Sequence, residues 1–226
     1  TPQQDTPHSR RRVSLADYEF ADLIDQQDKV RLLIDPTSSY ARAAAFAMGR
    51  AMDDVIIAAA TGTAYTGETG ATTESAQTAI AASIGSTTGL NIPKIAKAKQ
   101  LLDVADVDPS IARHIIVSPE QINNLLNVTE VTSADFNTVK ALVHGEIDTF
   151  LGFKFTVSNR LAKSGNDRTI IAYAEDGIAL AVGKDISARI DERADKSYAT
   201  QVYYCQTIGA TRMEQAKVVP ITCTEA

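Results

Sequence analysis

The stretch DPTSSYARAAAFAMGRAMDDVIIAAATG, residues 35–62, carries the clearest structural pattern in the chain. Its apolar side chains recur every three or four residues, which is the spacing of one face of an α-helix. Pro36 suits the first turn of such a helix, and Gly62 suits the position after its last turn. The stretch therefore predicts a helix over residues 36–61, about 35 Å long at about 1.5 Å per residue. Its many alanines allow close approach of neighbouring backbone, so we expect it to form a structural spine.

The segment before this helix is extended and charged. In VSLADYEFADLI, residues 13–24, apolar and polar residues alternate in part, which favours an exposed hairpin arm over a buried strand. Residues 1–35 contain seven acidic residues and five basic ones, and the basic ones begin with the triplet Arg10, Arg11 and Arg12. The arginines therefore lie at one end of an arm that is otherwise negative.

The remaining sequence predicts an α+β fold. Residues 61–91 are rich in Gly, Thr, Ser and Ala, which predicts a long polar loop with short strands. Two more helices are expected at 92–106 and 118–127, with Ser118 capping the second. Five strand-rich stretches follow: 148–161, 168–182 (with a short helix in its middle), 185–195, 198–213 and 216–224. A helical first half and a sheet-rich second half are typical of the α+β class.

Charge and composition exclude several classes of protein. The net charge is −6 and the pI is about 5.1, whereas dedicated nucleic-acid binders normally carry a basic footprint. The longest apolar run is too short for a membrane helix, so no membrane partner is expected. Cys205 and Cys223 lie in strand-like runs and are expected to be buried free thiols, although pairing through a hairpin stays open. Because the chain opens at Thr1 in polar sequence, we expect further sequence before it.

Candidate catalytic and metal-binding residues are scattered. Ser118, His144 and Asp148 have the residue types of a nucleophilic triad, but no glycines flank the serine as in a nucleophile elbow. HGEID offers His144 with Glu146 and Asp148 as metal ligands, without a second cluster to complete a site.

Two further motifs depart from their consensus patterns. DVADVD, residues 103–108, lacks the glycine of a calcium loop. GIALAVGKD, residues 177–185, has the wrong glycine spacing for a phosphate-binding loop and ends in Asp185 instead of Ser or Thr. The match of RRVS to a basophilic kinase consensus is short enough to arise by chance. We therefore predict no catalytic, cofactor or metal site.

Three stretches carry a resemblance to a known family. They are DTPHSRRRVSLADYEFADLIDQQDKVRLLIDPTSSYA (5–41), GRAMDDVIIAAATG (49–62) and GIALAVGKDISARIDERADKSYATQVYYCQTIGATRMEQAKVVPI (177–221). Together with the order of the predicted elements, they resemble the major capsid protein of tailed bacteriophages. The resemblance covers most of the chain and rests on these sequence stretches, not on a catalytic signature.

The resemblance implies the tailed-phage capsid fold and a division of the chain. Residues 1–35 would form an extended loop lying on a neighbouring subunit. Residues 36–109 would begin a peripheral domain around the spine helix 36–61, residues 110–180 would form an axial domain near the capsomer centre, and 181–226 would return to the peripheral domain. The family's N-terminal arm, which precedes the extended loop, has no counterpart in the chain.

The same resemblance implies a structural, non-enzymatic role. Copies would associate into hexamers and pentamers of an icosahedral shell around double-stranded DNA, assembled in the host cytoplasm and retained in the virion. Portal and scaffold proteins, a decoration protein and non-specifically bound packaged DNA are the further partners that it implies. No cofactor is implied.

The resemblance also suggests a role for the arginine triplet. An isolated hairpin arm buries too little surface to hold its shape, so it needs contacts with a neighbour. The arginines would pair with carboxylates of an adjacent subunit or of the opposite strand, with DNA contact and a local role as alternatives. The residues predicted to make contacts between subunits are Arg10, Arg11, Arg12, Asp17, Glu19, Lys29 and Arg31. An acidic inner wall would repel DNA phosphates during packaging.

Two rival interpretations stay open at this point. A bacterial nanocompartment shell shares the fold but encloses cargo enzymes. A soluble α+β hydrolase would use Ser118 and His144.

Overall fold

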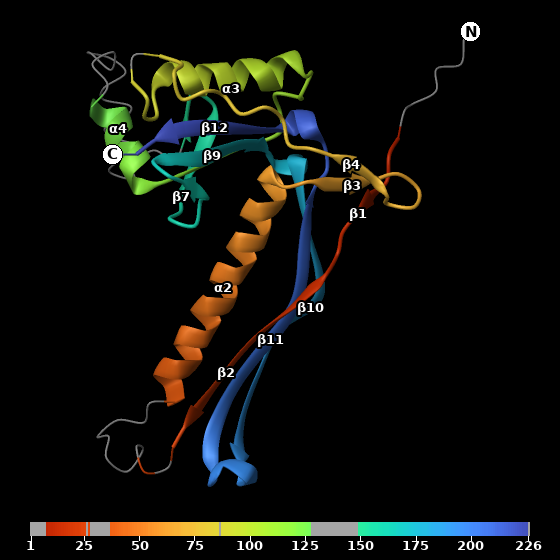
Figure 1. The fold of residues 1–226 in the computed structure, drawn as a ribbon, viewed down its shortest axis with the longest axis vertical. Helices are drawn as coiled ribbons and strands as arrows, with labels where there is room; N and C mark the ends of the chain where they lie inside the picture. The colour runs from red at the N-terminus through yellow and green to blue at the C-terminus, as the bar shows by residue number, and fades with distance from the viewer. Residues whose placement is uncertain (1–7, 26, 28–36, 86, 128–148, 226) are drawn as a thin grey trace. The chain divides into compact units, whose positions relative to one another are not determined.

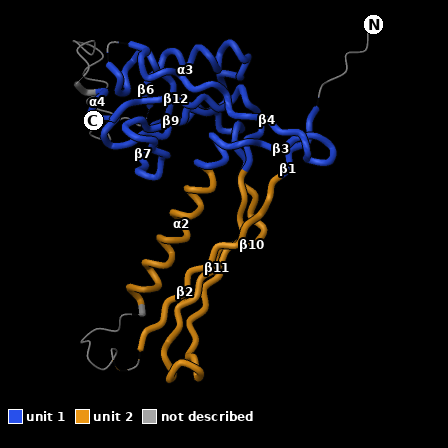
Figure 2. Tube along the Cα trace, viewed as in Figure 1, with its two compact units in different colours: residues 1–12, 57–179, 211–226 blue, residues 13–56, 180–210 orange. Residues whose placement is uncertain are grey.

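The computed structural model describes residues 8–25, 27, 37–85, 87–127 and 149–225 (Figure 1). The chain divides into two compact units, coloured separately in Figure 2. Unit 1 comprises residues 1–12, 57–179 and 211–226, and unit 2 comprises residues 13–56 and 180–210. Unit 1 thus joins residues 57–109 to residues 110–179, which the sequence interpretation assigned to different domains.

Unit 1 is built on a six-stranded mixed sheet with the strand order β12-β9-β5-β7-β6, and β8 pairs with β9 at its side. β5 runs parallel to β7, and the other pairs are antiparallel. The strands are β5 (Arg113–Val117), β6 (Thr149–Phe150), β7 (Phe153–Val157), β8 (Lys163–Ser164), β9 (Asp167–Ala174) and β12 (Val218–Thr224).

Two helices complete the core of unit 1. α3 (Ile92–Val104) contacts β12 and buries Ile95, Ala98 and Leu102, which recur at helical spacing. Asn91 caps it, since its side-chain oxygen accepts from the Lys94 N–H at 3.0 Å. α4 (Pro119–Asn127) adds Leu125 to the same apolar cluster. Both helices lie within the ranges that the sequence predicted.

A small sheet in unit 1, with the order β1-β3-β4, contains the first strand of the described chain. Its strands are β1 (Arg11–Arg12), β3 (Ala64–Thr66) and β4 (Thr72–Glu74). Gly67 and Gly70 turn the chain between β3 and β4 with φ values of 90° and 67°, which glycine adopts readily. The short strands expected within the polar loop 61–91 are therefore confirmed.

Unit 2 is a three-stranded sheet, ordered β10-β11-β2, with a long helix. The strands are β2 (Ala16–Ile24), β10 (Ile178–Arg193) and β11 (Ala199–Arg212), and short 3₁₀ turns occur at Glu175–Gly177, Ala194–Lys196 and Gln215–Lys217. β10 joins parts of two stretches that the sequence predicted separately, 168–182 and 185–195. The turn at Glu175–Gly177 matches the short helix expected inside residues 168–182.

The long helix α2 (Thr37–Thr61) confirms the predicted long helix, and its residues up to Ile56 belong to unit 2. Ala44 and Met48 are buried, and the Gln206 side chain on β11 donates a hydrogen bond to the Met48 carbonyl at 3.0 Å. The Gly62 N–H bonds the Ala58 carbonyl at 2.8 Å, so the helix ends at the predicted glycine.

Residues 13–24 were predicted to form an exposed, extended arm, and β2 is a largely exposed strand at the edge of a three-stranded sheet. β2 pairs antiparallel with β11, from Ala16 opposite Ile208 to Ile24 opposite Thr200. Within β2 the even-numbered residues from Tyr18 to Ile24 are partly or fully buried, while the odd-numbered ones are exposed. An edge strand needs only one buried face, so the partial alternation fits a strand of the chain's own sheet.

Within the described residues, no helix combines the length and apolar character that a bilayer-spanning segment needs. Cys205 and Cys223 are both free thiols, as the sequence favoured.

Candidate assembly surface

The arginine triplet lies on and beside β1, with its three side chains in different environments. Arg11 is largely buried and forms an ion pair with Glu74 of β4. Arg12 is exposed, and its guanidinium lies 5.4 Å from the centroid of the Tyr65 ring, within cation–π distance. Arg10 is exposed and makes no ion pair with any residue in the described part of the chain. Arg11 is therefore paired within its own chain, whereas Arg10 and Arg12 are exposed to solvent.

The predicted acidic contact residues lie on the exposed side of β2. Asp17 accepts a hydrogen bond from the Thr207 hydroxyl at 2.6 Å. Glu19 accepts one from the Tyr203 hydroxyl at 2.9 Å, and this bond raises the pKa of Tyr203 to about 12. These bonds fix both carboxylates on the strand while leaving them exposed. Lys29 and Arg31, the other two predicted contacts, lie outside the described residues.

Arg212 is a buried arginine that sequence reasoning missed. Only 1% of its surface is exposed, and its Nη1 donates to the carbonyls of Ala60 and Gly62 at 3.1 and 2.8 Å. Its Nη2 donates to the Glu74 carbonyl at 2.9 Å. Arg212 thus satisfies carbonyls at the end of α2 and holds β4, whose Glu74 carboxylate binds Arg11. The available signal was an arginine at the end of an apolar strand, downstream of a helix with no basic residue in its last turn.

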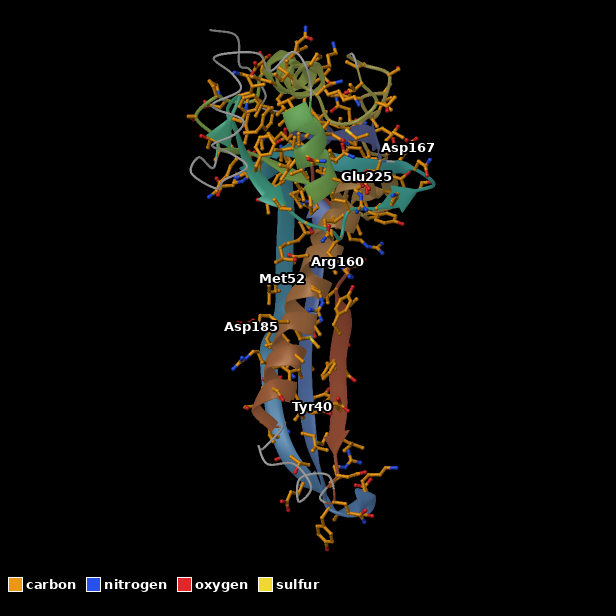
Figure 3. The ribbon with its side chains drawn as sticks, turned by 90° about the vertical axis from the view of Figure 1, so that its left-hand side faces the viewer. Tyr40, Met52, Arg160, Asp167, Asp185 and Glu225 are labelled. Atoms are coloured by element: carbon orange, nitrogen blue, oxygen red, sulfur yellow. The ribbon has the colours of Figure 1, made fainter. Side chains whose placement is uncertain are left out.

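A second buried polar cluster surrounds Glu225, which lies beside Asp167 in Figure 3. The carboxylate accepts hydrogen bonds from Ser118 Oγ at 2.5 Å, from Arg168 Nε at 2.8 Å and from Gln121 Nε2 at 3.3 Å. Lys163 Nζ lies 3.4 Å away. Burial alone would favour the neutral acid, but these hydrogen bonds outweigh it and lower the pKa of Glu225 to about 2. The cluster ties the end of β12 to the start of α4 and to β9.

The residues considered for catalysis have structural partners or lie outside the described residues. Ser118 Oγ accepts the Gln121 N–H at 3.3 Å, so its predicted capping role is confirmed. His144, Glu146 and Asp148 lie outside the described residues. Asp103 forms an ion pair with Arg113 at 2.7 Å, and Asp108 accepts the Ser110 N–H at 2.8 Å. Across the described ranges, no group of three or more His, Cys, Asp or Glu side chains converges as metal ligands.

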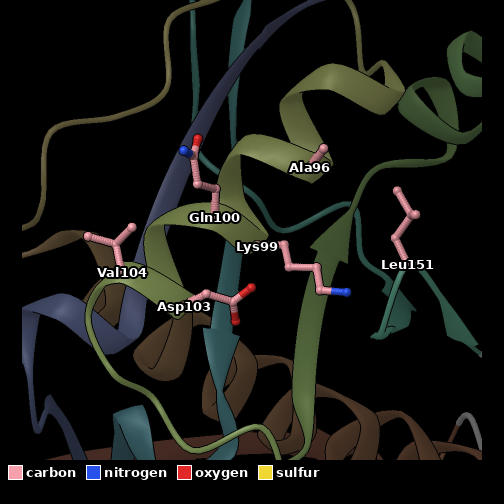
Figure 4. A pocket seen from close by; sticks show the side chains of 6 residues that line it. All are labelled: Ala96, Lys99, Gln100, Asp103, Val104 and Leu151. Carbon is pink, nitrogen blue, oxygen red and sulfur yellow. The ribbon is translucent and has the colours of Figure 1, made fainter.

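Unit 1 also has a shallow pocket of about 390 Å³ between α3 and the turn after β6, shown in Figure 4. Its lining residues are Ala96, Lys99, Gln100, Asp103, Val104 and Leu151. Since Asp103 is paired with Arg113, the lining offers no convergent set of nucleophile and base.

Comparison with known proteins identifies the fold. The chain is similar to a structure from Mycobacterium phage Che8, with 22% identity, a TM-score of 0.62, and coverage of 91% of this chain and 70% of that one. It is also similar to the capsid of cyanophage P-SCSP1u, with 14% identity, a TM-score of 0.68, and coverage of 95% and 74%. A third similar structure is the capsid of an empty GTA particle, with 13% identity, a TM-score of 0.67, and coverage of 94% and 74%. A search of curated proteins found no match.

These similarities confirm the predicted α+β fold of tailed-phage capsid proteins. A family model described as "Phage capsid protein" matches residues 1–225, which is nearly the whole chain. The protein therefore belongs to the phage capsid protein family and is a structural subunit of a phage capsid.

Proposed function

We propose that copies of this chain assemble as hexamers and pentamers into an icosahedral shell around double-stranded DNA, and that the chain has no enzymatic activity. The family match over residues 1–225 carries this proposal. Exposed apolar side chains support it. Leu180, Val182, Ile186 and Ile190 recur at even positions along β10 and are each at least 37% exposed. An exposed apolar row of this kind is typical of a surface that is covered in an assembly.

The roles of the segments follow the predicted division. Residues 1–35, whose strands β1 and β2 pair within the subunit's own sheets, supply surface for contact with a neighbouring subunit. α2 is the spine of the peripheral domain, and residues 110–180 form the axial domain. Portal and scaffold proteins, a decoration protein and packaged DNA are the proposed partners, with assembly in the host cytoplasm. The net charge of −6 opposes tight binding of DNA phosphates, so the proposed contact with packaged DNA is weak and non-specific.

Assembly is the first property to measure. Size-exclusion chromatography and negative-stain electron microscopy of the full-length protein, with scaffold protein co-expressed, should show closed shells or rings of five and six subunits. A monomer that persists at high concentration with scaffold present would contradict the proposal. Particles purified from infected cells should contain DNA, whereas particles that hold only cargo enzymes would favour the nanocompartment alternative.

The exposed charges supply a specific contact between subunits. In the proposed shell, Arg10 and Arg12 of one subunit lie against the acidic side of β2, with Asp17 and Glu19, on the next. Opposite charges on surfaces that meet repeatedly set register and accelerate encounter more than they add affinity. Each exposed pair contributes about 0–1 kcal/mol, so the effect accumulates over many copies.

Charge reversal tests this contact. Arg10→Glu should reduce the initial rate of assembly several-fold at low salt, because it places like charges together, and the difference should shrink as salt screens the interaction. The measurement is light scattering during assembly. Adding Asp17→Lys to Arg10→Glu should restore part of the rate. Lys97→Glu, at an exposed lysine of α3, is the control for net charge, and an equal loss in that variant would contradict the assignment.

A further inference from the structure

Each cysteine of the chain lies next to a lysine, but the two pairs differ in their surroundings. Cys223 Sγ is 3.9 Å from Lys94 Nζ, and both residues are 0% exposed. Lys94 Nζ is also held by the carbonyls of Thr88 and Gly89, each at 2.7 Å. In the second pair, Cys205 Sγ is only 3.0 Å from Lys184 Nζ. Cys205 is buried with 9% of its surface exposed, and Lys184 is exposed, so this sulfur lies just below the surface of unit 2.

The second pair joins two neighbouring strands. Lys184 and Ser187 come from β10, Cys205 comes from β11, and the Ser187 hydroxyl lies 3.0 Å from the same sulfur. Cys205 is opposite Glu19 of β2 in the register of the sheet, and Glu19 is occupied by the Tyr203 hydroxyl. Two polar groups of β10 therefore converge on one sulfur, and the carboxylate opposite it in the register accepts a hydrogen bond from Tyr203.

These contacts give the two thiols opposite reactivity. Hydrogen bonds with Ser187 and Lys184 lower the pKa of the Cys205 thiol. Burial raises the pKa of Cys223 to about 11, despite the lysine beside it. The thiolate is the nucleophilic form of cysteine, and its formation together with access decides which cysteine reacts with oxidants. Cys205 has a lowered pKa and keeps 9% of its surface exposed, whereas Cys223 has a raised pKa and no exposed surface.

We propose that Cys205 and Lys184 form a peroxide-reactive pair, in which oxidation of the sulfur leads to a covalent S–N link between β10 and β11. In the first step, the Cys205 thiolate attacks one peroxide oxygen, the O–O bond breaks, and sulfenic acid and hydroxide form. The hydroxide takes a proton from the Lys184 ammonium to give water and a neutral amine. The amine then attacks the sulfur, the S–O bond breaks, and a second water leaves. The sulfur loses two electrons, and the peroxide gains them.

The geometry suits the second step. The sulfur and nitrogen are already in hydrogen-bond contact, and the flexible four-carbon stem of lysine can close the remaining distance without moving either strand. The product links residues 184 and 205, which restricts the unfolded chain and should raise the thermal midpoint of the oxidised protein. This inference concerns the chemistry of the subunit and is independent of the proposed assembly.

The test is hydrogen peroxide treatment of the full-length protein, followed by intact-mass and peptide mass spectrometry. The expected product has lost the mass of two hydrogen atoms, joins the peptides that contain Lys184 and Cys205, and reverts with a thiol reductant. Lys184→Arg keeps a cation beside the sulfur but removes the nucleophilic amine. That variant should accumulate sulfenic acid, trapped by dimedone, without the link. Lys184→Met should slow the oxidation of Cys205 several-fold, and Cys223→Ser should change nothing.

Three results would overturn the proposal. Equal oxidation of Cys205 and Cys223 would show that the contacts of Cys205 do not activate it. A wild-type rate in Lys184→Met would exclude the lysine as the activating group. Sulfenic acid that persists without a link in the wild-type protein would exclude its capture by Lys184.

Discussion

Replacing Arg212 with methionine is expected to lower the free energy of unfolding by about 3–5 kcal/mol, because it removes the charged donor that three backbone carbonyls share. Methionine fills a similar volume but leaves the carbonyls of Ala60, Gly62 and Glu74 without their shared donor. Each buried carbonyl left unsatisfied costs about 1–3 kcal/mol. The measurement is chemical denaturation followed by circular dichroism.

Two variants make this result specific to the hydrogen bonds of Arg212. Arg212→Lys keeps the charge but lacks the planar guanidinium group. Its free energy of unfolding should therefore lie between those of Arg212→Met and the wild type. Arg10→Met, at an exposed arginine, should stay within about 0.5 kcal/mol of the wild type. If Arg212→Met unfolds at nearly the wild-type denaturant concentration, the buried arginine does not hold the end of α2 and β4 together.

Replacing Glu225 with glutamine is expected to be the second most damaging change, at about 2–3 kcal/mol near neutral pH, the range for hydrogen bonds to a charged group. Glutamine keeps an oxygen for Ser118 but loses the negative charge that faces Arg168 and Lys163. The two cations then remain beside a neutral side chain. Denaturation of both proteins at pH 7 measures the difference.

The same carboxylate predicts how stability depends on pH. The pKa of Glu225 is lowered from 4.5 to about 2 in the folded protein, so the folded state binds a proton less readily than the unfolded state. Its contribution is therefore complete above pH 4.5 and is lost as the pH falls from 4.5 towards 2. The difference in unfolding free energy between the wild type and Glu225→Gln should shrink over this interval.

A matched carboxylate provides the control for the pH series. Glu214 also pairs with a lysine, Lys217, at 2.9 Å, but it is exposed. Glu214→Gln should change stability by less than about 1 kcal/mol at any pH, as exposed ion pairs do. If the difference in unfolding free energy between the wild type and Glu225→Gln stays constant down to pH 3, the ionised form of Glu225 does not stabilise the fold.

Short-range patterns in the sequence predicted much of the secondary structure. The spacing of apolar residues and the position of Gly62 located α2, and Ser118 with Pro119 located the start of α4. The turn at Leu151–Gly152 escaped prediction, because Leu151 adopts a φ of 51° that its residue type rarely takes. Residues 16–24 were predicted to be extended, but their partner strand and their buried face were not, because only pairing with β11 determines them.

For the candidate contact residues too, the sequence shows the pattern and only the tertiary structure shows the role of each side chain. The triplet Arg10–Arg12 stands out in the sequence, yet its three side chains differ in role, because Glu74 and Tyr65 lie more than fifty residues along the chain. Nothing local distinguishes Arg11, which is paired, from Arg10, which is exposed. The pairing of Lys184 with Cys205 likewise depends on the register between β10 and β11.

The sequence by itself determined the fold class, the long helix and the resemblance to capsid proteins, because helical periodicity, capping and turn residues act over a few positions. Only the tertiary structure decided which charges are buried and what they hold. Arg212 and Glu74 are 138 residues apart, and Ser118 and Glu225 are 107 apart. A buried charge is stable only beside partners that the whole fold brings to it, and those partners leave no pattern near it in the sequence.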